Sequence, residues 1–440
     1  MNISTSLKPL VSVSLILVLG HFVLLMAQQQ ISSFERERGR MMLKVVKDDI
    51  KEHYYDTTFH GVNLDENFKA ADEKIKQATS NSQVFGIIGQ FLLDLKDSHT
   101  FFIPPMRGFQ VEYGWQMQMI GDTCMVTVVK PGSDAEAKGL KAGDIVRNVD
   151  GYTPTRETLW VLNYLFRAIW PRSSQRLVVQ SPGGEPRPLE IASKVKQGQK
   201  LLDLTNAVQY HDFLVQLQGE DYLRRNRFKE LGDDLIVWKM AEFSLTEKEV
   251  EGIMDRVKKR NNLILDMRGN GGGYVDTMRH VLGYVLGKEI KIADVKGRKE
   301  TRTEMSKNVG GAFQGKLIVL VDSNSASAAE IFARVMQLEK RAVVIGDQTS
   351  GSVMQSRHYG RALGTDSAVF YGSSITEADV IMTDGKSLER VGVTPDELLL
   401  PTAADLAANR DPVLAHAAEL LGVKIDPEKA GTLFPIEWSR

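Results

Sequence analysis

One serine lies where its hydroxyl could act as a nucleophile. Ser327 follows the apolar run 317–320, which predicts a short buried strand, and precedes residues 331–336, which predict a helix. A serine at such a junction lies among the free N–H groups of the first helical turn, where developing negative charge is stabilised. The alternative is structural, because Ser327 and Glu330 also fit a capping box in which the serine only caps the helix.

A glycine-rich segment at 269–273 follows a second apolar run and could supply an oxyanion site. Glycine lets backbone N–H groups approach a substrate carbonyl without interference from a Cβ atom. One donor from Gly271 or Gly272, together with the N–H of Ala328, would hold a tetrahedral oxyanion, and each such donor is worth about 3 kcal/mol. The alternative is a turn that only ends a strand. This segment lacks the dinucleotide-binding spacing. The segment 310–316 approaches the spacing of a phosphate-binding P-loop, but Leu317 stands where serine or threonine is needed and a strand follows instead of a helix.

The composition is that of a globular protein and gives no indication of a nucleic-acid partner, a metal or a cofactor. A chain of 440 residues, 42% hydrophobic and 25% charged, is expected to form two or three domains. Its net charge of -1 gives no electrostatic case for a nucleic-acid partner. Cys124 is the single cysteine, so an internal disulfide and a cysteine zinc cluster are excluded, and we expect it to be buried. The eight histidines include no His-Glu-x-x-His pattern, so neither a metal nor a cofactor is predicted.

The N-terminus has the composition of an export signal. Lys8 precedes a mainly apolar stretch that ends at Ala27 and is followed by three glutamines. This pattern predicts a secretory signal peptide over residues 1–27 and hence a periplasmic or extracellular protein. The alternative is an uncleaved anchor that tethers the chain to a membrane, because the apolar stretch approaches bilayer length.

The remaining chain divides into three parts. Residues 28–107 are mostly amphipathic helix, at 34–55 and 70–95, followed by a short strand at 101–103, and short strands with turns occupy 108–193. From 200 to 440, apolar strands alternate with helices, which predicts an α/β domain with a mainly parallel sheet covered on both faces. The expected strands of that domain lie at 235–238, 263–267, 317–321 and 342–345, and its helices at 246–259, 275–286 and 328–338.

The segment 108–193 resembles a PDZ domain of the bacterial protease type. The resemblance rests on the runs Pro131-Gly132-Ser133-Asp134, Gly139-Leu140-Lys141-Ala142-Gly143-Asp144 and Val149-Asp150-Gly151. It implies that an extended peptide tail adds as a strand to a sheet edge. The tail carboxylate would then meet the backbone of Tyr113, Gly114 and Trp115. The alternative is a small β domain with only a packing role.

The α/β part resembles the tail-specific, or C-terminal processing, serine peptidase family. The matching motifs are 263–273, 325–331, 346–351 and 391–396, in the family's order. The resemblance implies a crotonase/ClpP-like catalytic domain at 200–440, with Ser327 as the nucleophile. It also implies protein or peptide substrates, recognised through their C-terminal tails.

One departure from that family concerns the base. The processing branch places a lysine directly after Thr-x-Gly, and this chain has Ser352 there. The tricorn-like branch uses a Ser–His pair instead, and Ser98-His99 together with Glu389 resembles its set. An imidazole with an ordinary pKa of about 6.5 is a suitable base at neutral pH. Ser98 or Glu389 would orient the ring or stabilise its charged form.

Several alternatives remain open from the sequence. His358 is the alternative base, and Asp97 is a second residue that could orient the imidazole of His99. The sequence favours an exported serine endopeptidase that uses acyl-enzyme chemistry. The alternatives are a catalytically inactive peptide-binding member of the same fold and a scaffold protein whose PDZ domain carries the function.

Overall fold

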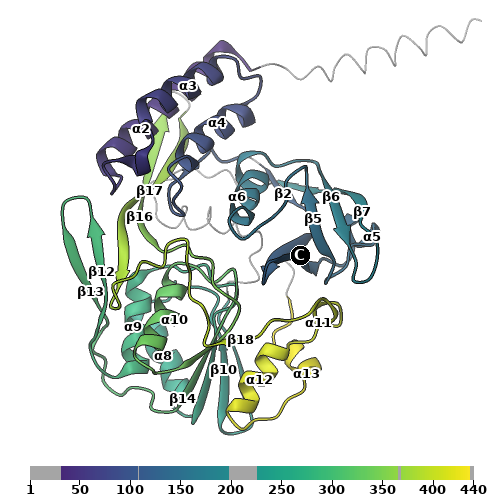
Figure 1. The fold of residues 1–440 in the computed structure, drawn as a ribbon, viewed down its shortest axis with the longest axis vertical. Coiled ribbons are helices and arrows are strands. Elements are labelled where there is room, and N and C mark those ends of the chain that lie inside the picture. Colours follow the sequence, from purple (N-terminus) through teal and green to yellow (C-terminus); the bar gives the residue numbers. More distant parts are fainter. Residues whose placement is uncertain (1–30, 108, 198–224, 365–367, 437–440) are drawn as a thin grey trace, which may run out of the picture.

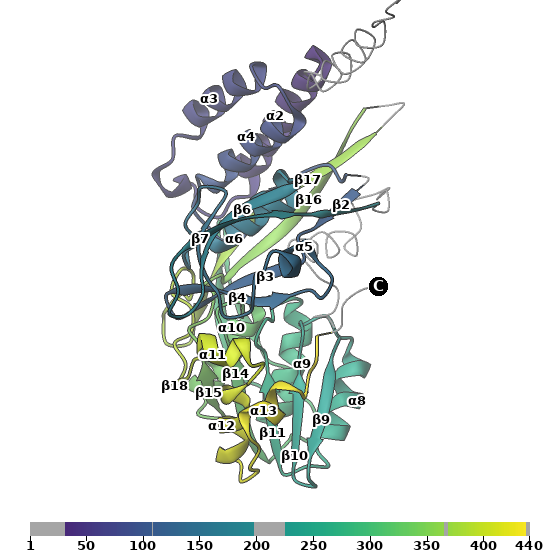
Figure 2. The ribbon, with the colours of Figure 1, turned by 90° about the vertical axis from the view of Figure 1, so that its right-hand side faces the viewer.

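The computed structural model describes residues 31–107, 109–197, 225–364 and 368–436. The expected signal peptide at 1–27 lies outside these residues. Three assemblies are visible in Figures 1 and 2. They are an N-terminal group of helices, an antiparallel five-stranded unit, and a six-stranded sheet with helices on both faces.

The six-stranded sheet has the strand order β18-β15-β14-β11-β10-β9. Its strands are β9 (Arg227–Leu231), β10 (Leu235–Lys239), β11 (Asn262–Asp266), β14 (Lys316–Val321), β15 (Val343–Gly346) and β18 (Glu397–Leu398). All neighbours pair in parallel except β9, which is antiparallel to β10. The four strands expected from the sequence are confirmed, whereas β9 and β18 were not expected, because one is half exposed and the other has two residues.

Helices cover both faces of this sheet (Figure 1). One face carries α8 (Glu247–Val257), α9 (Val275–Leu286) and α10 (Ala328–Leu338), and the other carries α12 (Pro412–Leu420) and α13 (Pro427–Gly431). Successive strand residues point to opposite faces, so Leu265 and Val319 enter the first core while Ile264 and Ile318 enter the second. Burial on both faces explains the continuous apolar runs of these strands.

A second, antiparallel sheet joins the N-terminal helices to the α/β part. It consists of β1 (Phe101–Ile103), β12 (Lys291–Gly297), β13 (Thr301–Met305), β16 (Met354–Leu363) and β17 (Val369–Met382). β1 pairs with β17 at Phe101 and Ser374, so residues just before β1 lie beside a strand that is distant in the sequence. The sequence predicted β1 but not its partner. Polar residues interrupt the apolar pattern of β12, β13 and β16, and the hairpin has a bulge between Gln355 and Ser356.

The N-terminal helices are α2 (Ser33–His53), α3 (Leu64–Lys76) and α4 (Asn81–Leu93). The expected helix at 34–55 is confirmed, but the prediction of one continuous helix over 70–95 is wrong. Ser80 ends that continuity, because its Oγ accepts from Gln83 N at 3.2 Å and caps the start of α4. The three helices pack together and against β17, with Ile88 and Ile375 in their shared core.

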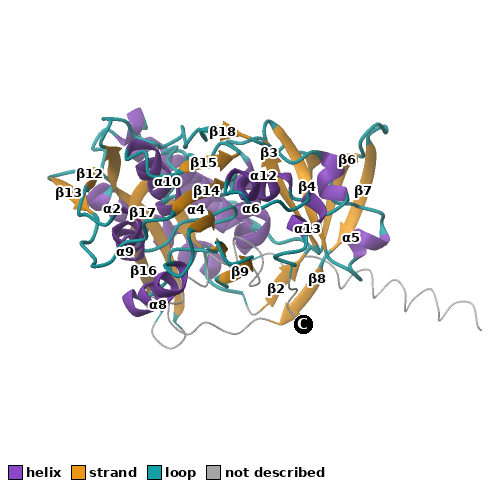
Figure 3. Ribbon diagram, turned by 90° about the horizontal axis from the view of Figure 1, so that it is seen from below, coloured by secondary structure: helices purple, strands orange, loops and turns teal. Residues whose placement is uncertain are grey.

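The antiparallel unit has the strand order β3-β4-β5-β6-β7, which leaves β3 at its edge. Its elements are β3 (Trp115–Ile120), β4 (Thr123–Val129), α5 (Asp134–Ala137), β5 (Ile145–Val149), α6 (Leu159–Tyr164), β6 (Ser174–Gln180) and β7 (Arg187–Ala192). The helix α6 is short, and Leu165–Ile169 form a π-helical turn after it. Cys124 is buried as expected, and burial raises the pKa of its thiol to about 12. The ribbon of β2 (Phe109–Glu112) and β8 (Lys194–Gln197) flanks this unit, which lies beside the parallel sheet in Figure 3.

The edge strand β3 contacts the turn that precedes Ser327. Gln118 Nε2 donates to Asp322 Oδ2 at 2.7 Å, and Ser323 Oγ donates to the carbonyl of Met119 at 2.6 Å. The edge of the antiparallel unit and the serine-bearing turn therefore share a contact.

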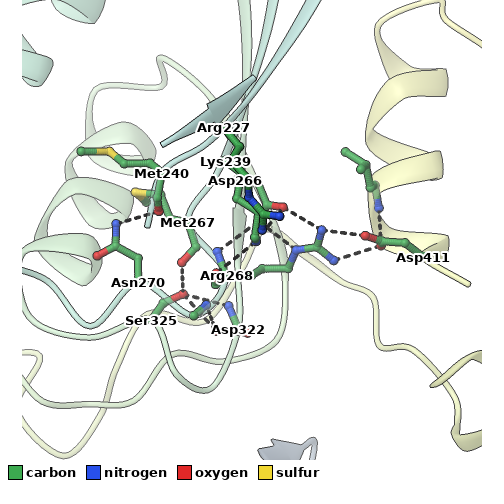
Figure 4. A network of polar contacts seen from close by, with 12 residues as sticks. Arg227, Lys239, Met240, Asp266, Met267, Arg268, Asn270, Asp322, Ser325 and Asp411 are labelled. Carbon is green, nitrogen blue, oxygen red and sulfur yellow. Dashed lines mark hydrogen bonds and ion pairs between the residues drawn. The ribbon is translucent and has the colours of Figure 1, made fainter. Parts of the chain in front are cut away.

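A buried ion network fixes the end of β11, where the glycine segment begins (Figure 4). Arg268 Nη2 lies 2.8 Å from Asp266 Oδ2 and 2.7 Å from Asp411 Oδ2, and Lys239 Nζ lies 3.1 Å from Asp266. Burial alone would raise the pKa of Asp266, but Arg268 and Lys239 outweigh it and hold this pKa below its ordinary value. Because Asp411 caps α12, the network joins the sheet to the C-terminal helices.

Candidate active site

Ser327 lies at the N-cap of α10 with φ 55° and ψ -120°. A positive φ is strained for a residue other than glycine, and such strain is often found at functional positions. The residue is half-buried, so its side chain is not enclosed by apolar neighbours. Its N–H donates to Ser352 O at 2.9 Å and to Glu330 Oε2 at 3.1 Å. The contact with Glu330 is the backbone half of the expected capping box, so the capping interpretation and the nucleophile interpretation are compatible.

Glu330 is fully buried below Ser327 and binds the loop after β15. Besides Ser327 N, its carboxylate accepts from Thr349 Oγ1 at 2.5 Å, Gly351 N at 2.7 Å and Ser352 N at 2.9 Å. Burial raises the pKa of Glu330 to about 7, although these hydrogen bonds act in the opposite direction. The sequence offered Glu330 only as a capping residue and gave no sign that it joins two loops.

The glycine segment packs directly against Ser327. Gly272 has φ 104°, and a Cβ atom there would lie 2.7 Å from Ser327 Cβ and 3.1 Å from Ala328 N. Only glycine allows this approach. The N–H of Gly272 donates to Asn270 Oδ1 at 2.9 Å, so it is already engaged. Of the two glycine donors considered from the sequence, Gly271 is therefore the better suited to join Ala328 at an oxyanion.

Two neighbouring residues, Ser98 and His99, form a relay with Glu389 from a distant part of the chain. Ser98 Oγ donates to Glu389 Oε2 at 2.8 Å and lies 2.7 Å from His99 Nδ1, while Ser98 N donates to Glu389 Oε1 at 2.9 Å. A carboxylate can only accept, and the single hydroxyl proton is given to Glu389, so Ser98 Oγ must accept from Nδ1–H. This assignment leaves the lone pair of a neutral His99 on Nε2, which is the nitrogen free to act as a base.

Burial tunes both ends of this relay. It lowers the pKa of His99, which favours the neutral ring at neutral pH, while the nearby charge of Asp97 acts in the opposite direction. Burial also raises the pKa of Glu389, against hydrogen bonds from Ser98 and Val353. Taken as a whole residue, His99 is half-buried.

One peptide group joins the relay to the serine. The carbonyl of Ser352 accepts from Ser327 N at 2.9 Å, and the N–H of Val353, in the same peptide group, donates to Glu389 Oε2 at 2.9 Å. Two such hydrogen bonds across one planar amide place Ser327 N and Glu389 Oε2 no more than about 8 Å apart. The Ser352 side chain, at the family's lysine position, contacts Ser350 Oγ at 2.9 Å.

His358 and Asp97, the alternatives considered from the sequence, are not part of the relay. His358 is on β16, paired with Ser374, and a Cβ atom on Gly372 would lie 2.9 Å from its Cε1. Asp97 accepts from backbone N–H groups of its own turn instead of from the imidazole.

The segment expected to meet a tail carboxylate lies at the start of edge strand β3. Tyr113 and Trp115 are buried, and the Tyr113 hydroxyl accepts from Arg172 N at 3.0 Å. Gly114 has φ 73°. Because both flanking side chains face the core, this segment can offer a ligand only its backbone.

Two absences concern only the described ranges. Within them, no group of three or more histidine, cysteine, aspartate or glutamate side chains is arranged to hold a metal ion. None of the helices in the same ranges is long and apolar enough to cross a membrane.

The raised pKa of Glu330 has a consequence for stability. Its pKa of about 7 in the folded chain, against an ordinary value of 4.5, means that the folded chain binds this proton more tightly. The resulting stabilisation is full below pH 4.5 and is lost as the pH rises through 7. In Glu330→Gln this titration is absent, so between these pH values the parent should lose about 3 kcal/mol of unfolding free energy relative to the variant.

Urea denaturation at several pH values measures this difference, with Glu339→Gln at the other end of α10 as the control. A difference between parent and Glu330→Gln that stays constant with pH would contradict the expectation.

Comparison with known proteins identifies the family. Residues 222–399 match the model of peptidase family S41. The chain is 24% identical over 373 residues to a chloroplastic C-terminal processing peptidase of Tetradesmus obliquus, covering 79% of this chain and 74% of that protein. It is 23% identical over 388 residues to a carboxyl-terminal-processing protease of Synechocystis, covering 84% of each.

Solved structures agree in fold. Mature CPAF complexed with lactacystin matches with a TM-score of 0.61 and 15% identity, covering 85% of this chain and 96% of that one. Mature CPAF alone matches with a TM-score of 0.63 and 14% identity, covering 85% and 95%. At these identities the likeness concerns the fold alone. The matched segment, residues 222–399, contains Ser327, Glu330 and Glu389 and has the sequence of an S41 serine peptidase.

Proposed function

We propose that this chain is an exported serine endopeptidase that cleaves protein or peptide substrates, with Ser327 as nucleophile and His99 as general base. The observation that carries the proposal is the relay Glu389–Ser98–His99, which is hydrogen-bonded to the same peptide group as Ser327 N. A nucleophile, a base and a residue that orients the base are the three parts that acyl transfer by serine needs.

The proposed reaction proceeds in two halves. His99 Nε2 takes the proton of Ser327 Oγ as that oxygen attacks the substrate carbonyl carbon, and the N–H groups of Gly271 and Ala328 donate hydrogen bonds to the oxyanion. His99 then gives the proton to the leaving amine, which departs and leaves an acyl-enzyme. Water, activated by the same imidazole, hydrolyses the ester and restores the Ser327 hydroxyl.

This assignment accounts for the missing lysine. Ser352 contributes its backbone carbonyl and N–H groups to the scaffold of the site. In the proposed mechanism His99 transfers the proton, so the Ser352 side chain is not needed as a base. An inactive binding protein is the alternative, and it is favoured only if the relay does not act on Ser327.

We assign substrate recognition to residues 108–193 as a PDZ domain, between a helical segment at 28–107 and a catalytic domain at 200–440. Two observations support this role: β3 is an edge strand that can pair with an extended tail, and its far end contacts Asp322 and Ser323 just before Ser327. A tail bound along β3 would therefore lead towards the nucleophile.

Export is part of the proposal and rests on the composition of residues 1–27. Cell fractionation tests it, and full-length protein found in the cytosolic fraction would contradict it.

A fluorophosphonate serine probe distinguishes the enzyme from an inactive binder. We expect the probe to label the parent chain and Ser352→Ala but not Ser327→Ala, because only the Ser327 hydroxyl is attacked. Mass spectrometry of the labelled peptide gives the position. Absence of labelling in the parent chain would favour the binder.

Tail recognition is tested with matched peptides that end either in a free carboxylate or in an amide. Fluorescence anisotropy with Ser327→Ala should show tighter binding of the free-carboxylate form, and the parent chain should cut that form faster. Peptides that bind but are never cut would indicate a scaffold protein, and equal affinity for both forms would contradict recognition of the tail.

A further inference from the structure

A second carboxylate, that of Asp97, binds the backbone of the turn that carries His99 and is not part of the relay. Asp97 is buried and uses a single oxygen, Oδ1, for three hydrogen bonds. It accepts from His99 N at 2.9 Å, from Thr100 N at 2.7 Å and from Thr376 Oγ1 at 2.6 Å. The turn that carries the imidazole is therefore closed by one carboxylate oxygen and fastened to β17.

Thr376 and Thr100 complete this fastening. Thr376 N donates to Thr100 Oγ1 at 3.0 Å, the two hydroxyls lie 3.1 Å apart, and Thr376 O accepts from Tyr55 N at 3.0 Å. The β16–β17 pairing is irregular beside Thr376, where Ser356 pairs with it and Gln355 pairs with Ala378. Such a bulge re-aims a side chain, which here reaches Asp97.

The other oxygen of Asp97 has no hydrogen bond of ordinary geometry. Asp97 Oδ2 and the hydroxyl of Tyr54 are both buried without such a hydrogen-bond partner among the described residues. The two groups are close enough to interact, since burial, then the charge of Asp97 and then a side-chain hydrogen bond with Asp97 raise the pKa of Tyr54. The Tyr54 hydroxyl therefore faces the Asp97 carboxylate. An unpaired buried polar group costs free energy, so its presence calls for an explanation.

We propose that Asp97 is a positioning residue for His99 with two separable effects. Its Oδ1 sets the backbone of the turn and so the direction of the ring, while the negative charge of the same carboxylate, held against the backbone N–H of His99, lies close to the imidazole. That charge stabilises the imidazolium that forms when His99 takes the proton of Ser327. The inference rests on the proposed role of His99 as base.

Other titratable groups lie around this turn and must stay unchanged in a test. Glu389 is linked to it through Ser98, and Tyr54 and Tyr55 follow α2, where Tyr55 N donates to Thr376 O on β17. Glu330 accepts a hydrogen bond from Ser352 N, on the side of the loop that faces Ser327. None of these four groups is altered by substitution of Asp97.

The test compares Asp97→Asn with Asp97→Ala by the rate at which a fluorophosphonate probe labels Ser327 across pH. Asparagine keeps an oxygen for the three donors and removes only the charge. We expect its acid limb to move to lower pH by up to about one unit, because a less stabilised imidazolium loses its proton more easily. Its maximal rate should fall about tenfold. Alanine also releases the turn, and misplacing the base should lower the rate about 100-fold.

Thr376 provides an independent test of the positioning effect. Thr376→Ser keeps the hydroxyl that donates to Asp97 and should label at nearly the parental rate. Thr376→Val has nearly the same shape but no donor, and it should label about tenfold more slowly with the acid limb near its parental position. Asp94→Asn, three residues before Asp97 and outside the relay, is the matched control and should behave as the parent.

The outcomes separate this inference from the proposed function. Labelling that does not occur in the parent, or that persists at full rate in His99→Ala, overturns both. If labelling depends on His99 but Asp97→Asn has the parental rate and pH profile, the charge effect is wrong. If Asp97→Ala and Thr376→Val also label like the parent, Asp97 does not position the base.

Discussion

A single peptide group connects the two halves of the proposed machinery. The Ser352 carbonyl accepts from Ser327 N, and the Val353 N–H donates to Glu389, which in turn binds Ser98 beside His99. The amide is planar, so the positions of its two partners are coupled. The nucleophile and the base can be held in register only while the loop after β15 keeps this orientation.

Much of the surrounding structure serves to hold that loop. Glu330 binds it from below through Thr349, Gly351 and Ser352 while also binding Ser327 N. The strained backbone of Ser327 costs about 1–3 kcal/mol, and hydrogen bonds from its N–H to two acceptors offset that cost. Close contact with Gly272 then excludes any side chain between the serine and the glycine segment.

The catalytic part of the fold could be predicted because its strands are buried on both faces. The runs at 263–267 and 317–321 are apolar throughout, which identifies strands, and adjacent parallel strands deliver their following loops to one edge of the sheet. The helix at 275–286 was also predicted correctly, since it begins after a glycine segment and ends at Gly287. These local signals are sufficient to place Ser327 beside the glycines.

The sequence could not reveal what links the base to this site. The position of His99 depends on the pairing of β1 with β17, two segments more than 260 residues apart. The strand β16 also pairs with β17, and its polar residues obscure the apolar alternation that would identify a strand. The break between α3 and α4 depends on one serine cap within an otherwise helical stretch. Glu330 and Asn270 organise the site through buried hydrogen bonds that no spacing in the sequence indicates.

The central claim is that His99, and not His358, is the base for Ser327. The most direct measurement is the rate of fluorophosphonate labelling of Ser327 in His99→Ala and His358→Ala. Loss of a base of this kind costs several orders of magnitude in rate. The account predicts that His99→Ala loses at least about 100-fold while His358→Ala labels at close to the parental rate. The opposite result, with His99→Ala unimpaired and His358→Ala inactive, would contradict it.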